Sequence, residues 1–412
     1  MADLAIRARA RQSGFTLAEM AVSLFVTVSV LLGVLMLFDF TNKLSKVQGN
    51  VADMQQSLRI AQHDVVRLVR MAGRGGLPVG NLPAGLAVSV RNNVAAGQRI
   101  GGTTTPRILE GTDVLTVRGV FAAPIYRLPE PGQIAFNGVG GPGGATRGSI
   151  VIPAAEPANL AQDLEPLRQA ITKGRREALV LISRQNSHVY AVVELDPANS
   201  NAGDPNQVTV AFFISGGQHT GSYRTLSPNG AFPATLTTVS FVGLLEEYRF
   251  YVREEHADRN DDASDLTPKL SRARVYPGTD APWDGDDDNW QNDIADNILD
   301  VQIAFGLDTM NGGCSVAESE STCTIAETED GTGDDWLFND TAAPDAALLA
   351  GAPLHYVRLS TLARTDRRDI NYQSPLLVRL EDHDFAGSLY NEREERMFRR
   401  RLLQTVIDMR NL

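Results

Sequence analysis

The N-terminal part of the chain shows two successive hydrophobic patterns. Residues 15–38 are mostly apolar, and no charged residue occurs from 20 to 38. A helix rises about 1.5 Å per residue, so a run of this length can cross a bilayer core of roughly 30 Å. After this run, apolar residues recur at alternating steps of three and four, the spacing that buries one stripe of a helix. The stripe comprises Leu44, Val47, Val51, Met54, Leu58, Ala61, Val65, Leu68 and Ala72.

Glycine residues at 73, 75 and 76 and a proline at 78 provide a stop for this helix. We therefore assign 15–76 to an N-terminal helical segment, membrane-spanning to about 38 and then amphipathic, with the helix ending near Ala72. The amphipathic stripe fits either the protein's own β-sheet or a coiled coil. The strand-rich sequence that follows needs a cover, and this favours the sheet.

Beyond residue 77, short runs of β-branched and aromatic residues alternate with turn residues, a pattern that predicts strands. The expected strands are 113–120, 178–182, 189–195, 207–214, 237–242, 247–253, 299–306, 355–363 and 376–380. Short helices are expected at 160–172 and 392–398. The predicted fold class is α+β: a long N-terminal helix packed on an enlarged antiparallel β-sheet domain, 77–412. Long acidic loops are expected at about 215–300 and 310–350, and the body is either one domain or a sheet with an inserted subdomain.

The charge distribution predicts how the chain sits in a membrane. Arg7, Arg9 and Arg11 precede the apolar run, so the N-terminus should stay cytoplasmic and the body should be exported. A secretory signal has its small-residue cleavage site after the apolar core, whereas here Ser13-Gly14 comes before it. The formal net charge of −12 argues against nucleic-acid binding, which requires a basic surface.

The run from Gly14 to Met20, GFTLAEM, resembles the signal of type IV prepilins. The resemblance implies a leader peptide at 1–14, a cut after Gly14 by prepilin peptidase, and N-methylation of Phe15. Glu19 then occupies the fifth mature position, where the family's glutamate meets the N-terminal amine of a neighbouring subunit during assembly. Ala18 replaces the branched aliphatic residue that is usual before this glutamate.

Four further blocks resemble PilW-type minor pilins: Arg70-Met71-Ala72-Gly73, 111–119, 298–309 and 399–412. The resemblance implies a type IV pilin fold and a role in priming and assembly of a type IV pilus, within a tip complex. Implied partners are other minor pilins, the major pilin, the inner-membrane assembly platform and a tip adhesin. The subunit would first be a single-pass inner-membrane protein with a periplasmic C-terminal domain, and would later lie at the pilus tip at the cell surface. Such pili serve cell adhesion and twitching motility. A J-type pseudopilin of type II secretion and a tip adhesin are the alternatives.

Two features suggest structural chemistry in the exported body. Cys314 and Cys323 are the two cysteines of the chain, and a close pair in an exported protein fits a disulfide, although two free thiols are the alternative. Asp284, Asp286 and Asp288 alternate like the first ligands of a calcium loop. The rest of that loop motif is missing, which favours a solvated acidic loop over a calcium site.

No motif of an enzyme occurs in the sequence. The six histidines are scattered singly, and none has the spacing of a zinc site. His383 lies between Asp382 and Asp384, yet no serine stands in a nucleophile-elbow setting. We therefore expect a non-catalytic protein without a cofactor. Tryptophans at 283, 290 and 336 lie in acidic stretches, where they either contact a partner or pack a loop onto the sheet.

Overall fold

The structure, a computed structural model, describes residues 16–77, 87–101, 105, 107–137, 146–155, 158, 160–186, 188–255, 266–283, 290–307, 336–338 and 354–409. It confirms the α+β class, because a long N-terminal helix is followed by a large antiparallel sheet. The chain forms two compact units, Met1–Asp53 and Met54–Leu412, and the boundary between them falls inside the first helix.

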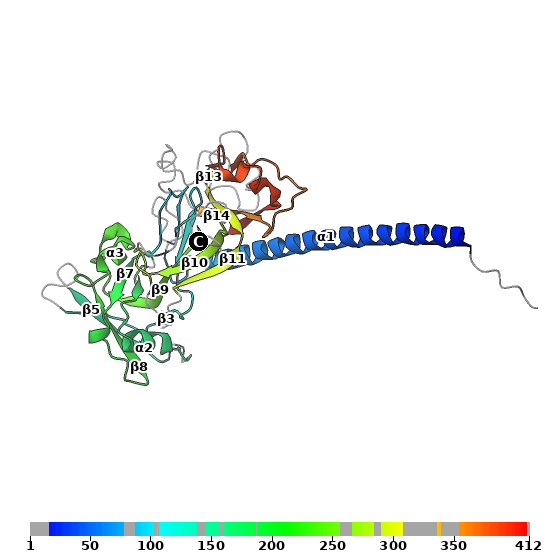
Figure 1. Ribbon diagram of the computed structural model, residues 1–412. Helices are drawn as coiled ribbons and strands as arrows, with labels where there is room; N and C mark the ends of the chain where they lie inside the picture. Colours follow the sequence, from blue (N-terminus) through cyan, green and yellow to red (C-terminus); the bar gives the residue numbers. More distant parts are fainter. Residues whose placement is uncertain are drawn as a thin grey trace, which may run out of the picture. The chain divides into compact units, whose positions relative to one another are not determined.

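Helix α1, Leu17–Arg70, is continuous and close to the expected helix (Figure 1). Among the described residues it is the one helix long and apolar enough to cross a membrane. Every described side chain from 16 to 46 is exposed. The hydroxyls of Ser23, Thr27 and Ser29 donate to backbone carbonyls about one turn earlier, at 2.7–3.0 Å. These hydroxyls are therefore already satisfied if lipid surrounds the helix.

The part of α1 in the second unit packs against the body. The buried residues include the expected stripe positions from Met54 to Leu68, whereas Leu44, in the first unit, is 46% exposed. Gln62 is also buried: its Nε2 donates to the Leu403 carbonyl at 2.9 Å, and its Oε1 accepts from the Thr405 hydroxyl at 2.6 Å. This part of the helix thus covers the protein's own sheet, as the strand-rich sequence predicted.

Glycines end α1 because the following turn has no room for side chains. Gly75 and Gly76 have φ angles of 101° and 87°, in the left-handed region that favours glycine. A Cβ on Gly75 would lie 2.5 Å from a methyl of Val120, and one on Gly76 would lie 2.1 Å from a methyl of Ile182. The turn therefore packs directly against β6 and against the residue that follows β2.

The larger sheet has eleven strands, all paired antiparallel, in the order β1-β2-β9-β6-β7-β8-β5-β4, with β3 and β10 also on β9 and β11 on β10. Figure 1 shows β9, β10 and β11 side by side. The bounds are β1 Val88–Arg91, β2 Val114–Gly119, β3 Tyr126–Arg127, β4 Ala135–Asn137, β5 Arg147–Pro153, β6 Ala178–Ser183, β7 Tyr190–Leu195, β8 Gln207–Phe213, β9 Val239–Arg253, β10 Lys269–Val275 and β11 Gln291–Asp296.

A second sheet of four strands has the order β13-β12-β14-β17. Its bounds are β12 Ile298–Leu307, β13 Trp336–Phe338, β14 Leu354–Arg364 and β17 Arg400–Asp408. Between β14 and β17 the chain forms the two-residue strands β15, Arg379–Leu380, and β16, His383–Asp384. The helices after α1 are short: α2 Glu165–Thr172, α3 Thr220–Thr225, and the 3-10 turns η1 Pro197–Asn199, η2 Pro228–Gly230, η5 Leu389–Asn391 and η6 Glu395–Met397.

The expectation of a long acidic loop at 215–300 was wrong, because this range contains α3, β9, β10 and β11. Strands expected separately at 237–242 and 247–253 form one strand, β9. Strand β10 escaped the sequence pattern because Arg272 and Arg274 alternate with its buried Ala273 and Val275. The strand expected at 376–380 shortens to β15, and the expected helix at 392–398 is the 3-10 turn η6. Apart from β13, the expected loop at 310–350 lies outside the described residues.

Replacing Gln62 by alanine tests how α1 is attached to the second sheet. The change removes two side-chain hydrogen bonds and leaves the Leu403 carbonyl without that donor. We expect the free energy of unfolding to fall by about 1–3 kcal/mol, measured by urea denaturation of the full chain in micelles. Gln56→Ala, on an exposed position of the same helix, is the matched control and should change stability by less than about 0.5 kcal/mol. Equal effects of the two substitutions would show that Gln62 does not attach the helix.

Candidate functional site

Of the site residues predicted from sequence, the structure describes Glu19. Thr16 precedes the first turn of α1, and its hydroxyl accepts from the backbone N–H of Glu19 at 3.3 Å. The Glu19 carboxylate in turn accepts from the backbone N–H and the hydroxyl of Thr16, both at 2.9 Å. This reciprocal arrangement is a capping box, which satisfies helix N-terminal donors that otherwise lack partners. Glu19 is therefore held by its own helix in the monomer.

The remaining predicted site residues lie outside the described residues. They are Gly14 and Phe15 at the expected cleavage position, Cys314 and Cys323 of the expected disulfide, and Asp284, Asp286 and Asp288 of the possible calcium loop. Within the described ranges, no group of three His, Cys, Asp or Glu side chains is placed to hold a metal ion.

Two of the three tryptophans pack loops onto the body. The Trp283 indole N–H donates to the buried Glu177 at 2.9 Å, and the Arg274 guanidinium lies 3.6 Å from the ring centroid. Trp290 packs against a core cluster that includes Tyr251 and Val275. These contacts confirm the packing alternative for both residues. The side chain of Trp336 lies outside the described set.

Asp113 connects the two sheets. It has no exposed surface, and it lies directly before β2 of the larger sheet. Its backbone N–H donates to the carbonyl of Val301 at 2.9 Å, and its Oδ2 accepts from the backbone N–H of Ile303 at 2.7 Å. Oδ1 accepts from the N–H of Asn93 at 2.9 Å. Asp113 therefore makes two hydrogen bonds with β12 of the second sheet, directly before the start of β2 in the larger sheet.

A second buried carboxylate, Asp300 on β12, orients His383. The Nδ1 atom of His383 lies 2.8 Å from Oδ2 of Asp300, whose Oδ1 accepts from Nε2 of Gln302 at 2.9 Å. Burial raises the pKa of the Asp300 carboxyl, while His383 opposes that shift. The contact fixes which ring nitrogen of His383 faces Asp300, and the direction of the hydrogen bond depends on which of the two side chains carries the proton.

The imidazole of His383 also packs against Phe385 and Gly111. Its ring stacks on Phe385 with centroids 4.1 Å apart. A Cβ on Gly111 would lie 2.4 Å from Nε2, so the ring rests against the backbone at this glycine, whose φ is 78°. The side chain is 16% exposed. The side chain of His383 is therefore largely enclosed by the protein.

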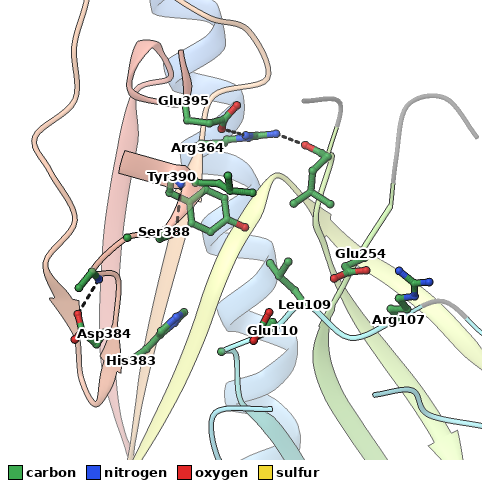
Figure 2. A pocket seen from close by; sticks show the side chains of 15 residues that line it. Arg107, Leu109, Glu110, Glu254, Arg364, His383, Asp384, Ser388, Tyr390 and Glu395 are labelled. Atoms are coloured by element: carbon green, nitrogen blue, oxygen red, sulfur yellow. Dashed lines mark hydrogen bonds and ion pairs between the residues drawn. The ribbon is translucent and has the colours of Figure 1, made fainter. Parts of the chain in front are cut away.

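A cavity of about 580 Å³ adjoins His383 (Figure 2). Such a volume lies within the range of roughly 300–1,000 Å³ that is typical of small-molecule pockets. Figure 2 shows His383, Asp384 and Tyr390 on one wall and Leu109, Glu110 and Glu254 on the other. The two walls come from the segment 383–390 and from the chain before β2 and after β9.

The upper end of the cavity in Figure 2 contains a neutralised arginine. Arg364 pairs with Glu395 at 2.6 Å and donates to the carbonyl of Leu266. Burial lowers the pKa of Arg364, and the Glu395 carboxylate opposes the shift. Burial also raises the pKa of the Tyr390 phenol. One end of the cavity therefore contains the ion pair of Arg364 and Glu395. The other end contains His383, Glu110 and Asp384.

Sequence reasoning singled out His383 for its aspartate neighbours but did not find its partner. Asp300 stands 83 positions earlier, in a strand whose other residues are mostly apolar. An aspartate in a buried strand is costly unless it is paired, and this was the one signal available. Asp382, the immediate neighbour, turns instead towards the side-chain amides of Asn92 and Asn93, at 2.6 and 2.8 Å.

Comparison with known proteins supports the predicted family. Residues 249–411 match the family model described as Type IV Pilus-assembly protein W, PilW. The match confirms the resemblance to PilW-type proteins over this part of the chain and indicates involvement in type IV pilus assembly. No curated protein and no solved structure matches the chain.

The protonation of Asp113 predicts a pH effect on stability. Burial raises the pKa of this carboxyl well above its usual range, and the nearby Asp382 and Asp300 add to the shift against the two backbone donors. The folded state then binds the proton more tightly than the unfolded state. This contribution is present below the unfolded pKa and is lost as pH rises towards the folded pKa.

We therefore expect the stability difference between wild type and Asp113→Asn to fall as pH rises from about 4 to 7, with a maximum slope of about 1.4 kcal/mol per pH unit. Asparagine adds a cost that does not depend on pH, because its amide group opposes one backbone donor. Urea denaturation at several pH values measures the difference. Asp366→Asn, at a side chain that is 69% exposed, should show no such trend. A constant difference between wild type and Asp113→Asn would contradict the assignment.

Proposed function

We propose that this PilW-type chain is a minor pilin that takes part in priming and assembly of a type IV pilus, within a complex at the pilus tip. The match of 249–411 to the pilus-assembly family carries the proposal. The apolar, exposed first part of α1 supports it, because such a surface requires lipid or other helices around it. The proposed role is non-catalytic, and it uses the type IV pilin fold.

In the proposed pathway, prepilin peptidase cuts after Gly14, and Phe15 becomes the methylated N-terminus. Before this cut, the basic leader keeps the N-terminus in the cytoplasm. The body lies in the periplasm, so the subunit is a single-pass inner-membrane protein. Export would also place Cys314 and Cys323 where a disulfide forms. Loading into the filament would then carry the body to the cell surface, next to other minor pilins, the major pilin and a tip adhesin.

The capping box gives Glu19 a defined state before assembly. A carboxylate in the hydrocarbon region is costly unless it is hydrogen-bonded or paired. The two donors of Thr16 provide part of that compensation in the monomer. In the filament, the amine of a neighbouring mature N-terminus would replace part of it with an ion pair. Glu19 would thus set the register of this subunit against its neighbour.

The processing step predicts the mass of the mature chain. Intact-mass and N-terminal peptide mass spectrometry of protein from the native membrane should show a chain that begins at N-methylated Phe15. A bulky replacement, Gly14→Leu, should leave the leader attached, because the peptidase cuts after this glycine in the family. The neighbouring Ser13→Ala is the control and should be processed normally. A native chain that retains residues 1–14 would remove the prepilin assignment.

The assembly role predicts a specific loss in a strain that lacks this gene. Sheared surface pilus should be strongly reduced, and type II secreted proteins, assayed in the same cultures, should be unaffected. Wild-type protein should restore pili, whereas Glu19→Ala should not, because it lacks the carboxylate that pairs with a neighbour. Leu24→Ala, an exposed apolar position of the same helix, is a control that should restore pili.

Each alternative function predicts a different outcome of this experiment. Normal pili with failed secretion would move the protein to the pseudopilins of type II secretion. Normal pili with reduced attachment of cells to surfaces would indicate an adhesin. Loss of both pili and secretion would show a general defect of the envelope rather than the proposed role.

A further inference from the structure

Strand β17 is an open edge of the second sheet. It pairs with β14 in one continuous register from Arg400 to Asp408, and no described strand pairs with its other side. The strands β1, β4 and β13, at the other ends of the two sheets, have only four, three and three residues. Proteins usually protect an edge strand by making it short, charged, bulged or covered. Residues 402–407 of β17 carry no charge, so this nine-residue strand has none of the first three protections.

The backbone of every second residue of β17 faces away from β14. The N–H of Thr365 donates to the carbonyl of Arg399 at 2.8 Å, so odd-numbered residues form the hydrogen bonds between these two strands. Even-numbered residues of β14 bond towards the start of β12 instead, as the N–H of Arg364 does with the Asn297 carbonyl at 3.0 Å. No partner for the even-numbered backbone groups of β17 lies within the described residues. The groups at the open edge therefore include the N–H and C=O of Leu402, Gln404 and Val406.

In the described structure, the hydrogen bonds of helix α1 leave this edge open. Gln62 donates to the Leu403 carbonyl and accepts from the Thr405 hydroxyl, and both of these residues are odd-numbered. The side chains of Leu402 and Val406 are 47% and 45% exposed. An extended segment can therefore reach the free N–H and C=O groups without displacing the helix.

The two ends of β17 carry opposite charges that lack partners. Nη2 of Arg400 donates to the carbonyls of Tyr390 and Glu395, but its Nε and Nη1 are buried and have no acceptor in the described structure. A buried donor without an acceptor is costly. Asp408, at the other end, is exposed and makes no ion pair with a described residue. The edge therefore fits a strand with an acidic residue at one end and a basic residue at the other.

We propose that β17 accepts an extended segment of a partner protein as an additional antiparallel strand. The segment has an acidic residue opposite Arg400, apolar residues opposite Leu402 and Val406, and a basic residue opposite Asp408. Its main chain bonds to the free edge, and its side chains provide specificity, as in other cases of strand addition. This binding surface goes beyond the role in pilus assembly.

A second copy of β17 has the same complementary pattern, but the membrane argues against it as the occupant. Antiparallel pairing about Gln404 places Asp408 of one copy opposite Arg400 of the other. It also reverses the direction of the second sheet, and of the part of α1 that packs on it, in one copy relative to the other. Two chains anchored in one membrane have helices that run in the same direction. The choice of a partner segment thus rests on the membrane topology proposed above.

A synthetic peptide of residues 399–409, with blocked ends and a fluorescent label, is the probe, because its sequence is complementary to the edge in the antiparallel direction. Fluorescence anisotropy measures its binding to the wild-type full chain in micelles, and we expect saturable binding. N-methylation of the peptide at Gln404 should weaken binding at least about tenfold, because this N–H faces the edge. N-methylation at Leu403, whose N–H points away, is the matched control and should have little effect. Equal effects of the two modifications, or no saturable binding, would overturn the proposal.

Variants of the chain locate the binding on β17. Leu402→Pro removes one N–H from the open edge and keeps the hydrogen bonds with β14, so the strand should remain folded, as urea denaturation can verify. It should weaken peptide binding at least about tenfold. Leu402→Ala loses the same side chain but keeps the N–H, and it should weaken binding less than about threefold. Equal losses in both variants would show that the backbone edge is not the site.

A change in the peptide alone tests the charged ends. The substitution Asp408→Lys in the peptide places a cation opposite Arg400 and should weaken binding about two- to fivefold. Unchanged binding would overturn the assigned charge pairing.

Sedimentation equilibrium of the full chain in micelles distinguishes the two occupants. We expect a monomer at the concentrations that bind the peptide. A dimer that the peptide dissociates would assign the edge to a second copy and would overturn the partner segment. This outcome would leave the role in pilus assembly untouched, because pilus counts in the deletion strain test that role separately.

Discussion

The hydrogen bonds of Asp113 are the constraint on which the arrangement of the body depends. A buried aspartate is costly unless its oxygens are hydrogen-bonded. Here Oδ2 of Asp113 accepts from the backbone N–H of Ile303 on β12. By accepting from Ile303 and donating to Val301, it holds β12, in the second sheet, against the start of β2. Because a buried polar group that loses its hydrogen bonds destabilises the fold, these bonds hold the two sheets in one register.

The site beside His383 follows from that same junction. The register that Asp113 imposes on β12 also sets the position of Asp300, two strand residues before Gln302. Gln302 donates both to Asp300 and to the Gly111 carbonyl, which ties the loop before β2 to the same strand. His383 then fits between Asp300 and Gly111. The position of His383 therefore depends on how β12 of the second sheet lies against the chain before β2 of the larger sheet.

Sequence analysis predicted the parts of this protein that follow from periodicity, and it failed where contacts are long-range. The helix stripe from Met54 to Leu68 and most strands that were expected are present. Strand β10 was missed because its arginines find acids on other elements, such as Arg272 with Asp64 of α1 and Arg274 with Glu246 of β9. A charged residue looks the same in a sequence whether it is solvated or paired. The pairing of Asp300 with His383 was hidden for the same reason.

The helix boundary at Asp53 and Met54 shows how the chain divides its apolar surface. From Met54 onward, the stripe of α1 is buried by strands of the same chain. Before it, side chains such as Leu24 and Phe38 are 67% and 65% exposed among the described residues. Exposed apolar surface of this extent is stable only within a membrane or against other helices. The first unit thus depends on its surroundings for burial, whereas the second unit buries its own core, and this difference suits the proposed role, in which the subunit passes from a bilayer into a filament.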